Sequence, residues 1–198
     1  MTNIFSKISK KLNSKFYFDY NIGKHTWFRT GGNAKIFVIV HNDKELEIIL
    51  NELNNDNFYI LGAGSNLLIR DNGFNGIILK LGTGFNYLEI IEDKLKVGAS
   101  VLDIHLSNFA LKNSIEGFEF YSGIPGSIGG AIKMNAGCFG SETKDRIASI
   151  QVYKNFSIEN MNKNNLSLAY RSSNIQNNQI ILNASFNISF GDTNEIKQ

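Results

Sequence analysis

The sequence predicts a protein of mixed helices and strands whose two halves differ in character. Two features of the chain lead to this prediction. A strand, a helix and a second strand follow one another between Ala34 and Leu61, which is the order of a βαβ-like unit. The second half changes character, so we place a soft boundary near Leu81–Gly84.

Composition is that of an ordinary globular protein. The 198 residues suffice for one domain or two small lobes, with 42% hydrophobic and 19% charged residues. A net charge of +2 is too small to indicate a nucleic-acid or membrane partner. The single cysteine, Cys138, excludes an internal disulfide, and with three scattered histidines it offers no metal-ligand spacing. We therefore expect no metal site.

The first 20 residues are expected to form an N-terminal extension. Ile4, Phe5, Ile8 and Leu12 have helical spacing, which predicts a short amphipathic helix. The segment lacks the apolar run of a signal peptide, and no stretch approaches transmembrane length. The expected location is the cytoplasm.

The elements of the first lobe, residues 21–83, follow from apolar patterns. Paired glycines close a loop before the first strand, and Asp43 resembles a helix N-cap. The helix carries one apolar stripe, and an Asp-Asn-Gly turn at 71–73 precedes the last strand. In order, we expect a loop at 21–33, a strand at 34–40, a helix at 44–53 and strands at 58–61 and 77–81.

The second lobe, residues 84–190, starts with two alternating strands around Glu92-Asp93, a hairpin pattern. A helix with an apolar face follows, and Asp192 or Thr193 resembles the cap of a helix that is not completed. Residues 191–198 thus read as the start of a further domain. In order, we expect strands at 87–91 and 94–98, a helix at 101–113, a strand at 147–153, a turn region at 154–165 and a strand at 179–190.

Ser122–Gly140 is the most unusual stretch, because it holds a dense cluster of glycines and the only proline, Pro125. Glycine permits close backbone approach at a cost in entropy, so such a cluster indicates a ligand or a tightly packed partner. Ser127–Asn135 could form a short helix whose N-terminal amides, free of partners, point back over Gly123–Gly126. That arrangement suits a phosphate. The alternative is a glycine-rich turn before a close helix contact.

A second glycine loop, Gly62–Leu67, follows the strand at 58–61. It invites comparison with the dinucleotide fingerprint G-x-G-x-x-G, but Leu67 stands at the third glycine position and no helix pattern follows. These departures argue against a Rossmann nicotinamide site. What remains is a nest of exposed amides, with Ser65 and Asn66 as side-chain donors, which suits an anion.

Four motifs occur in a fixed order: residues 26–34 (TWFRTGGNA), 61–69 (LGAGSNLLI), 123–131 with 134–137 (GIPGSIGGA, MNAG) and Tyr170-Arg171. Together they resemble the UDP-N-acetylenolpyruvoylglucosamine reductases, also called UDP-N-acetylmuramate dehydrogenases, over about Asn21–Phe190. The resemblance implies a two-lobed α+β FAD-binding fold of the vanillyl-alcohol-oxidase (PCMH-like) type, with non-covalent FAD between the lobes.

The resemblance also implies site residues and a reaction. NADPH would reduce FAD, and the flavin would reduce UDP-N-acetylglucosamine enolpyruvate to UDP-N-acetylmuramate for peptidoglycan synthesis. Arg171 would be the catalytic arginine that polarises the substrate, and Tyr170 would join it in binding substrate. The implied cofactor-binding residues are Leu61, Gly62, Gly64, Ser65, Asn66, Leu67, Gly123, Ile124, Pro125, Gly126, Ser127, Gly129, Gly130, Asn135 and Gly137.

The chain departs from the family in one respect. The family's proton-donor serine and supporting glutamate lie in a C-terminal domain, and neither Ser172 nor Ser173 matches the serine motif. We therefore expect a fragment, whose partner could be a separately encoded C-terminal fragment. The alternatives are a flavin-binding module without turnover, or another FAD oxidoreductase of the same fold. The roles of Cys138 (flavin attachment or packing) and Arg29 (phosphate or surface) stay open.

Overall fold

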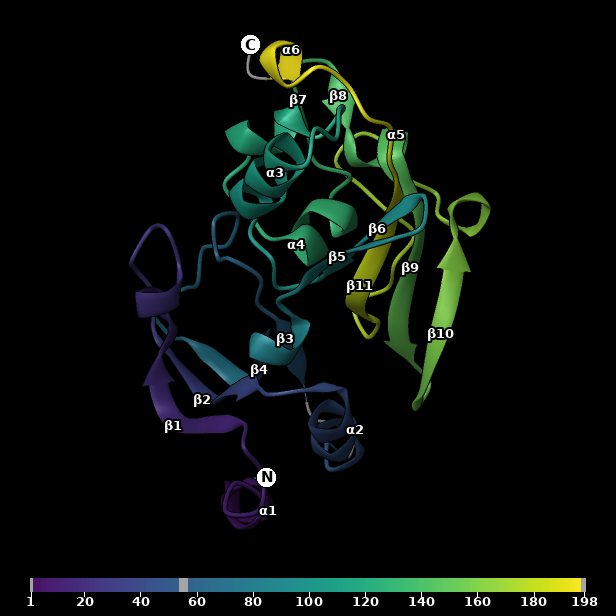
Figure 1. Ribbon diagram of the computed structural model, residues 1–198. Helices are drawn as coiled ribbons and strands as arrows, with labels where there is room; N and C mark the ends of the chain where they lie inside the picture. Colours follow the sequence, from purple (N-terminus) through teal and green to yellow (C-terminus); the bar gives the residue numbers. More distant parts are fainter. Residues whose placement is uncertain (1, 54–56, 197–198) are drawn as a thin grey trace. The chain divides into compact units, whose positions relative to one another are not determined.

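The computed structural model describes residues 2–53 and 57–196. The chain divides into two compact units, Met1–Phe85 and Asn86–Gln198. Figure 1 shows the elements in chain order, with the first unit in purple to blue and the second in teal to yellow. No described helix has the length and apolarity needed to cross a membrane.

The first unit is built on a four-stranded sheet in the order β1-β2-β4-β3. Its strands are β1 (Lys15–Asn21), β2 (Asn33–Val40), β3 (Phe58–Ile60) and β4 (Phe74–Leu81). The strands β2 and β3 each pair with β4 in parallel, whereas β1 pairs with β2 antiparallel. The predicted strand–helix–strand unit is confirmed, but its two strands, β2 and β3, are not neighbours in the sheet because β4 lies between them.

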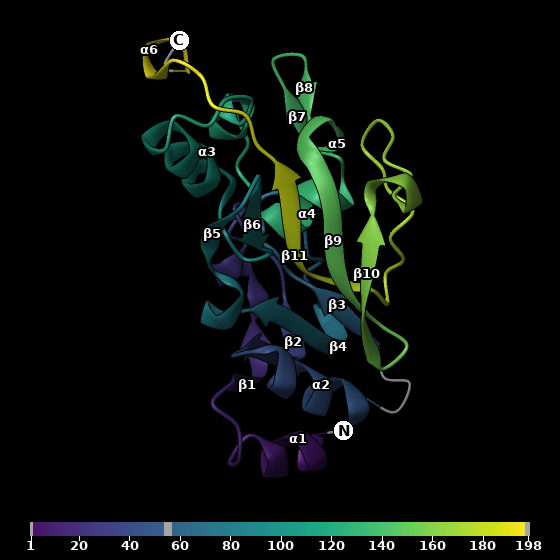
Figure 2. The ribbon, with the colours of Figure 1, turned by 45° about the vertical axis from the view of Figure 1, so that its right-hand side comes forward.

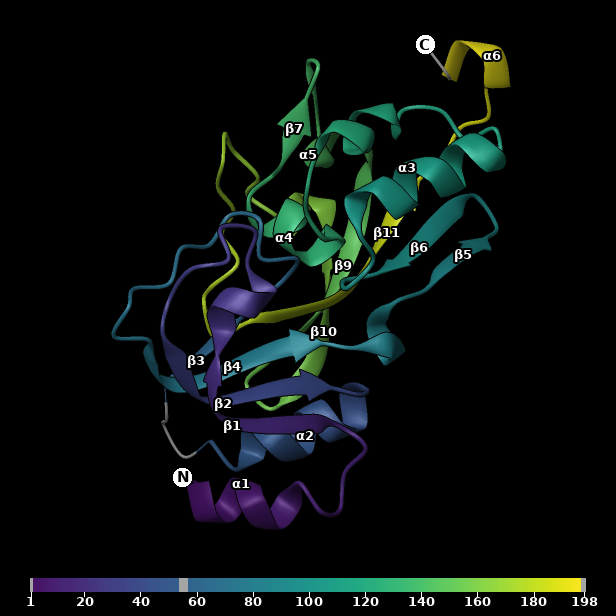
Figure 3. The same cartoon turned by 90° about the vertical axis from the view of Figure 1, so that its left-hand side faces the viewer.

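Helices α1 (Thr2–Ile8) and α2 (Asp43–Asn51) lie on one side of this sheet (Figure 3). Phe5 of α1 and Leu46 and Ile49 of α2 are fully buried. The other side carries an apolar cluster that anchors the loop after β3 through Leu61. The predicted N-terminal helix is shorter than its apolar spacing suggested, because the chain turns at 9–14 into β1, a strand that the sequence analysis did not predict.

The turn between α1 and β1 is held by one carboxylate. Glu45 of α2 accepts hydrogen bonds from the main-chain N–H groups of Asn13 (3.0 Å) and Ser14 (2.7 Å) and from both side chains. Burial alone would raise the pKa of Glu45, but these bonds outweigh it and lower the pKa. The carboxylate therefore stabilises the fold while it is ionised.

The second unit is built on a five-stranded antiparallel sheet in the order β10-β9-β11-β6-β5. Its strands are β5 (Leu88–Ile91), β6 (Lys94–Gly98), β9 (Ile147–Lys154), β10 (Ser157–Asn162) and β11 (Ile180–Asn187). The predicted β5–β6 hairpin and the strands at β9 and β11 are confirmed. The turn region predicted at 154–165 is wrong, because β10 forms there as an edge strand.

Short helices and one small hairpin complete the second unit (Figure 2), and the helix α4 (Ile128–Lys133) packs on β6 and β11. Phe118 packs edge-on against Phe186 of the sheet, with ring centroids 5.7 Å apart. The predicted helix at 101–113 is confirmed as α3. The short elements of the second unit are α3 (Asp103–Lys112), η3 (Glu119–Gly123), α4 (Ile128–Lys133), β7 (Gly137–Cys138), β8 (Ser141–Glu142), α5 (Thr143–Arg146), η4 (Lys163–Asn165) and α6 (Thr193–Ile196). The first unit has two 3-10 turns among its described residues, η1 (Ile22–His25) and η2 (Thr83–Phe85).

Replacing Glu45→Ala leaves the buried donors of Ser14 without an acceptor, so we expect the free energy of unfolding to fall by about 2–3 kcal/mol. Urea unfolding at pH 7 measures the change. Glu47→Ala, an exposed residue on the same helix, is the matched control and should lie within about 0.5 kcal/mol of the parent. Equal effects of the two substitutions would contradict the role given to Glu45.

Candidate functional site

The loop after β3 in the first unit carries bare main-chain donors. Among the described residues, the N–H groups of Gly62–Asn66 have no hydrogen-bond partner. The loop is nevertheless fixed, since the carbonyl of Gly64 accepts from the N–H of Trp27 at 3.0 Å. Gly64 has φ +78°, and a Cβ there would collide with the His25 carbonyl. A rigid loop with unpaired amides is suited to an anion, as the sequence predicted.

The residues predicted at this loop divide by environment. The side chains of Leu61 and Leu67 pack in or against the apolar cluster, so only their main chain is left for a ligand. Ser65 is partly buried and Asn66 is exposed. Arg29 is also exposed, with φ +50°.

The glycine loop at 123–130 in the second unit is held by a short ladder of main-chain hydrogen bonds to residues 99–103. Gly129 and Ile128 donate to the carbonyls of Ala99 and Val101, each at 2.9 Å. Gly126 in turn accepts from the N–H of Asp103 at 3.1 Å. The prediction that the helix starting here presents free N-terminal amides is wrong for Ile128 and Gly129, because the ladder uses them.

Three other amides of this loop remain available. Within the described residues, the N–H groups of Gly126, Ser127 and Gly130 have no partner. The helix α4 is also only six residues long, because Asn135 adopts a left-handed φ of +42° just after it. The anion-binding character of this loop therefore depends on individual amides rather than on a long helix dipole.

Two kinds of glycine can be distinguished in this loop. A Cβ at Gly126 would collide with Asp103 Oδ2, and one at Gly129 would lie 3.2 Å from Ala99 Cβ, so packing explains both. A Cβ at Gly130 would approach nothing closer than Ser127 Oγ, at 3.7 Å. Because no packing requires glycine at Gly130, its bare backbone is suited to the approach of an external molecule.

Asp103 lies beneath this loop and was not singled out in the sequence. Its side chain is fully buried, and neither carboxyl oxygen has a hydrogen-bond partner among the described residues. Burial raises its pKa to about 7. A sequence signal existed, because Asp103 falls on the apolar stripe of α3 with Leu106 and Ala110.

The arginine predicted to be catalytic sits in a tight turn. Both main-chain bonds between Ala169 and Ser172 (3.1 Å each) close the turn, with Tyr170 and Arg171 at its tip. Arg171 has φ +52°, a conformation that costs a non-glycine residue about 1 kcal/mol and often marks functional positions. Tyr170 is 82% exposed, and its ring centroid lies 5.8 Å from the Arg171 guanidinium carbon.

Tyr170 and Arg171 line a cavity of about 530 Å³ in the second unit together with Asn135 and Gly137. Four of the predicted site residues are thus brought together. Cys138 also lines this cavity and is partly buried, and a Cβ at Gly123 would lie 3.2 Å from its Sγ. The structure adds a charged group that the sequence analysis missed, comprising Glu142, Lys144 and Asp145.

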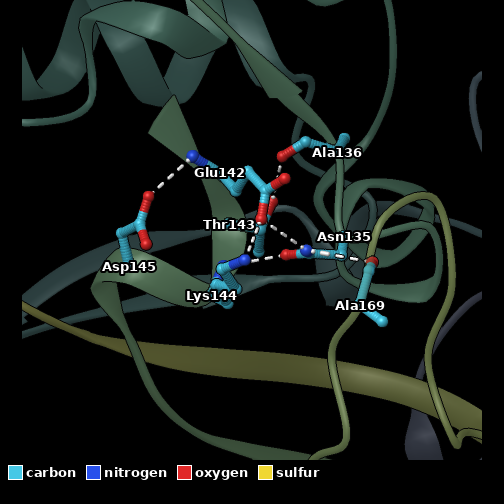
Figure 4. Close-up of polar contacts among 7 residues, drawn as sticks. All are labelled: Asn135, Ala136, Glu142, Thr143, Lys144, Asp145 and Ala169. Carbon is cyan, nitrogen blue, oxygen red and sulfur yellow. Dashed lines mark hydrogen bonds and ion pairs between the residues drawn. The ribbon is translucent and has the colours of Figure 1, made fainter. Parts of the chain in front are cut away.

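Asn135 joins three chain segments at this cavity (Figure 4). Its Nδ2 donates to Glu142 Oε2 (3.0 Å) and to the Ala169 carbonyl (3.1 Å), and its Oδ1 accepts from the N–H of Lys144 (3.0 Å). The residue is only 2% exposed. Asn135 therefore fixes the arginine turn relative to α4 and the β8–α5 segment.

Glu142 is the charged counterpart of this arrangement. Its carboxylate forms an ion pair with Lys144, and its main-chain N–H donates to Asp145 Oδ2 in a capping box. Hydrogen bonds from Lys144 and Asn135, together with the charge of Arg171, lower the pKa of Glu142. The cavity is thus lined by two carboxylates, Glu142 and Asp145, and by two cations, Lys144 and Arg171.

Unpaired loop amides, bare glycine backbone and a cavity with an arginine are features of a protein that binds a nucleotide cofactor. A family model described as "FAD binding domain" matches residues 34–155, and the chain belongs to this family. FAD is thus the cofactor that family membership assigns, and the loop amides and open Gly130 fit a diphosphate. Which residues contact FAD stays a prediction.

The resemblance drawn from the four motifs is confirmed. A UDP-N-acetylenolpyruvoylglucosamine reductase of Pelagibacter ubique (strain HTCC1062) is 42% identical over 183 residues, covering 91% of this chain and 61% of that protein. The enzyme of the same name from Rickettsia massiliae (strain Mtu5) is 43% identical, covering 90% and 61%. The chain therefore spans about 61% of the length of these curated relatives.

Solved structures confirm the predicted fold class. UDP-N-acetylenolpyruvylglucosamine reductase from Thermus caldophilus superposes with a TM-score of 0.81 at 26% identity, over 94% of this chain and 66% of that one. An alkyldihydroxyacetonephosphate synthase has a TM-score of 0.65 at 12% identity, over 96% and 40%. The second likeness shows the fold alone.

Replacing Asn135→Ala should release the arginine turn, because Ala169 and Lys144 each lose a side-chain partner. We expect faster amide exchange at Ser172 and a loss of about 2–3 kcal/mol in the free energy of unfolding. Hydrogen-exchange mass spectrometry and urea unfolding measure the two effects. Asn160→Ala, on the exposed edge strand β10, is the control, and unchanged protection of residues 169–173 in Asn135→Ala would refute the role.

Replacing Asp103→Asn should change how stability depends on pH. The folded-state pKa of about 7 exceeds the unfolded value of 3.8, so the folded protein binds more protons between these values and loses stability as pH rises. From pH 5 to pH 8 this loss amounts to about 2–3 kcal/mol, and it should vanish in Asp103→Asn. Thermal unfolding across this range tests it, with exposed Asp93→Asn as control; parallel pH profiles would contradict the assignment.

Proposed function

We propose that this chain is the flavin-binding part of a UDP-N-acetylenolpyruvoylglucosamine reductase. The observation that carries the proposal is the relatives of that name, about 42% identical over about 90% of the chain. The reaction would reduce UDP-N-acetylglucosamine enolpyruvate to UDP-N-acetylmuramate, with NADPH as reductant. The cytoplasmic location expected from the sequence stays a prediction.

In this proposal each glycine loop contributes main-chain donors to FAD. A diphosphate would use the N–H groups that have no partner in the described part of the chain, which are those of Gly62–Asn66 in the first unit and of Gly126, Ser127 and Gly130 in the second. When bound, the flavin supplies hydride transfer between NADPH and the enolpyruvyl double bond. The chain's own residues bind and orient the reactants.

Arg171 is assigned the charge-stabilising role. Hydride addition to an enolpyruvyl group builds negative charge towards the carboxylate, and a planar guanidinium meets it with two parallel donors. The turn at 169–172 and its hydrogen bond to Asn135 hold the main chain of Arg171 in place before the substrate binds. Tyr170, largely exposed on the cavity rim, would contact the same substrate.

The first test is cofactor binding. Purified chain mixed with FAD should retain the yellow flavin absorbance after gel filtration. A colourless protein would overturn the proposal. Turnover is then measured as NADPH oxidation with the enolpyruvyl sugar, by the chain alone and with the C-terminal part of a relative supplied in trans.

The variant Arg171→Ala should bind FAD normally but reduce the enolpyruvyl sugar at least about 10²–10³-fold more slowly than the parent, because charge stabilisation is lost. Arg70→Ala, an exposed arginine of the first unit, is the control and should match the parent. If the parent chain binds FAD but oxidises no NADPH, either alone or with the C-terminal part of a relative, a flavin-binding module without turnover is favoured. Oxygen consumption with an alcohol substrate instead would favour another oxidoreductase of this fold.

A further inference from the structure

Asp103 is an unusual group for a protein interior. It is 0% exposed, and both its carboxyl oxygens lack hydrogen-bond partners among the described residues. Ionised carboxylates are costly to bury without partners, so such a group stays protonated unless something in its surroundings compensates. Nothing in the mechanism above uses this group.

The carboxyl group touches the glycine loop directly. The Asp103 N–H donates to the Gly126 carbonyl at 3.1 Å, and Oδ2 occupies the space that a Cβ on Gly126 would need. Gly126 is one of the loop residues whose N–H group has no partner among the residues that the structure describes. An anion bound to the Gly126 amide would therefore lie close to the buried carboxyl group of Asp103.

Burial alone raises the pKa of Asp103, and no described cation lowers it. No titratable side chain occurs in residues 99–102 and 126–130, the two segments that main-chain hydrogen bonds join beside Asp103. On η3, Glu119 accepts from the Gly117 N–H, and Tyr121 donates its hydroxyl proton to Thr143 Oγ1. Burial raises the pKa of Tyr121, so it stays neutral, and His105 on α3 is exposed.

We propose that Asp103 is a positioning residue that couples FAD binding to uptake of one proton. The neutral carboxyl accommodates the FAD diphosphate on the loop amides, whereas the carboxylate repels it from the far side of Gly126. The affinity for FAD then falls as pH rises through neutrality. This inference rests on the proposed function, because it takes the diphosphate of FAD as the anion at this loop.

The magnitude follows from two charges held several ångströms apart near a protein surface, which amounts to about tenfold in affinity. Because burial raises the pKa of Asp103 to about 7, the change falls in an accessible range. The dissociation constant for FAD should rise about five- to tenfold between pH 6 and pH 8.5.

The test titrates FAD into the full chain between pH 5.5 and pH 8.5, following flavin fluorescence. Asp103→Asn should bind at pH 8.5 as tightly as the parent does at pH 6, with a flat profile. Asp93→Asn carries the same chemical change on the exposed β5–β6 turn and should keep the parent's slope. A flat parent profile, or an unchanged slope in Asp103→Asn, overturns the proposal.

A second measurement needs no variant. Calorimetric titration of the parent chain with FAD at pH 7.5, in two buffers of different ionisation enthalpy, gives the number of protons taken up. About half a proton is expected, and zero or proton release overturns the coupling. Failure to bind FAD at every pH would instead overturn the proposed function, whereas pH-independent binding overturns only this inference.

Discussion

The main-chain ladder between residues 99–103 and 126–129 is the constraint on which the candidate site of the second unit depends. It connects the end of β6 and the start of α3 to the glycine loop through three hydrogen bonds. Buried main-chain groups must be paired, so the ladder decides which loop amides are used and which stay free. The same close approach excludes a side chain at Gly126 and buries the carboxyl group of Asp103.

A single side-chain amide extends this order to the arginine. Asn135 follows α4, which continues from the glycine loop, and it binds the turn that carries Arg171. The glycine loop with its free amides and the turn that carries Arg171 are therefore both attached to the same short helix, α4. Such preorganisation matters because donors already in place need not reorganise when charge develops.

The sequence predicted the fold best where burial imposes a pattern. The apolar residues of β2, β6 and β9 were recognised because each of these strands buries side chains in a core. The edge strands β1 and β10 escaped, since their side chains are largely exposed or half-buried and their order comes from pairing with a neighbour. The local sequence of such a strand does not show with which neighbour it will pair.

Alone, the sequence determined the family and hence the cofactor, because four motifs in fixed order are recognisable without coordinates. It also singled out Arg171 and the two glycine loops. Only the tertiary structure decided that Ile128 and Gly129 are not free donors, and that the Asp103 carboxyl group has no hydrogen-bond partner among the described residues. It also decided that Asn135 reaches Ala169, 34 residues away. The reason is physical: a polar group's partner is set by which distant segments pack beside it, and the chain's local pattern does not encode that proximity.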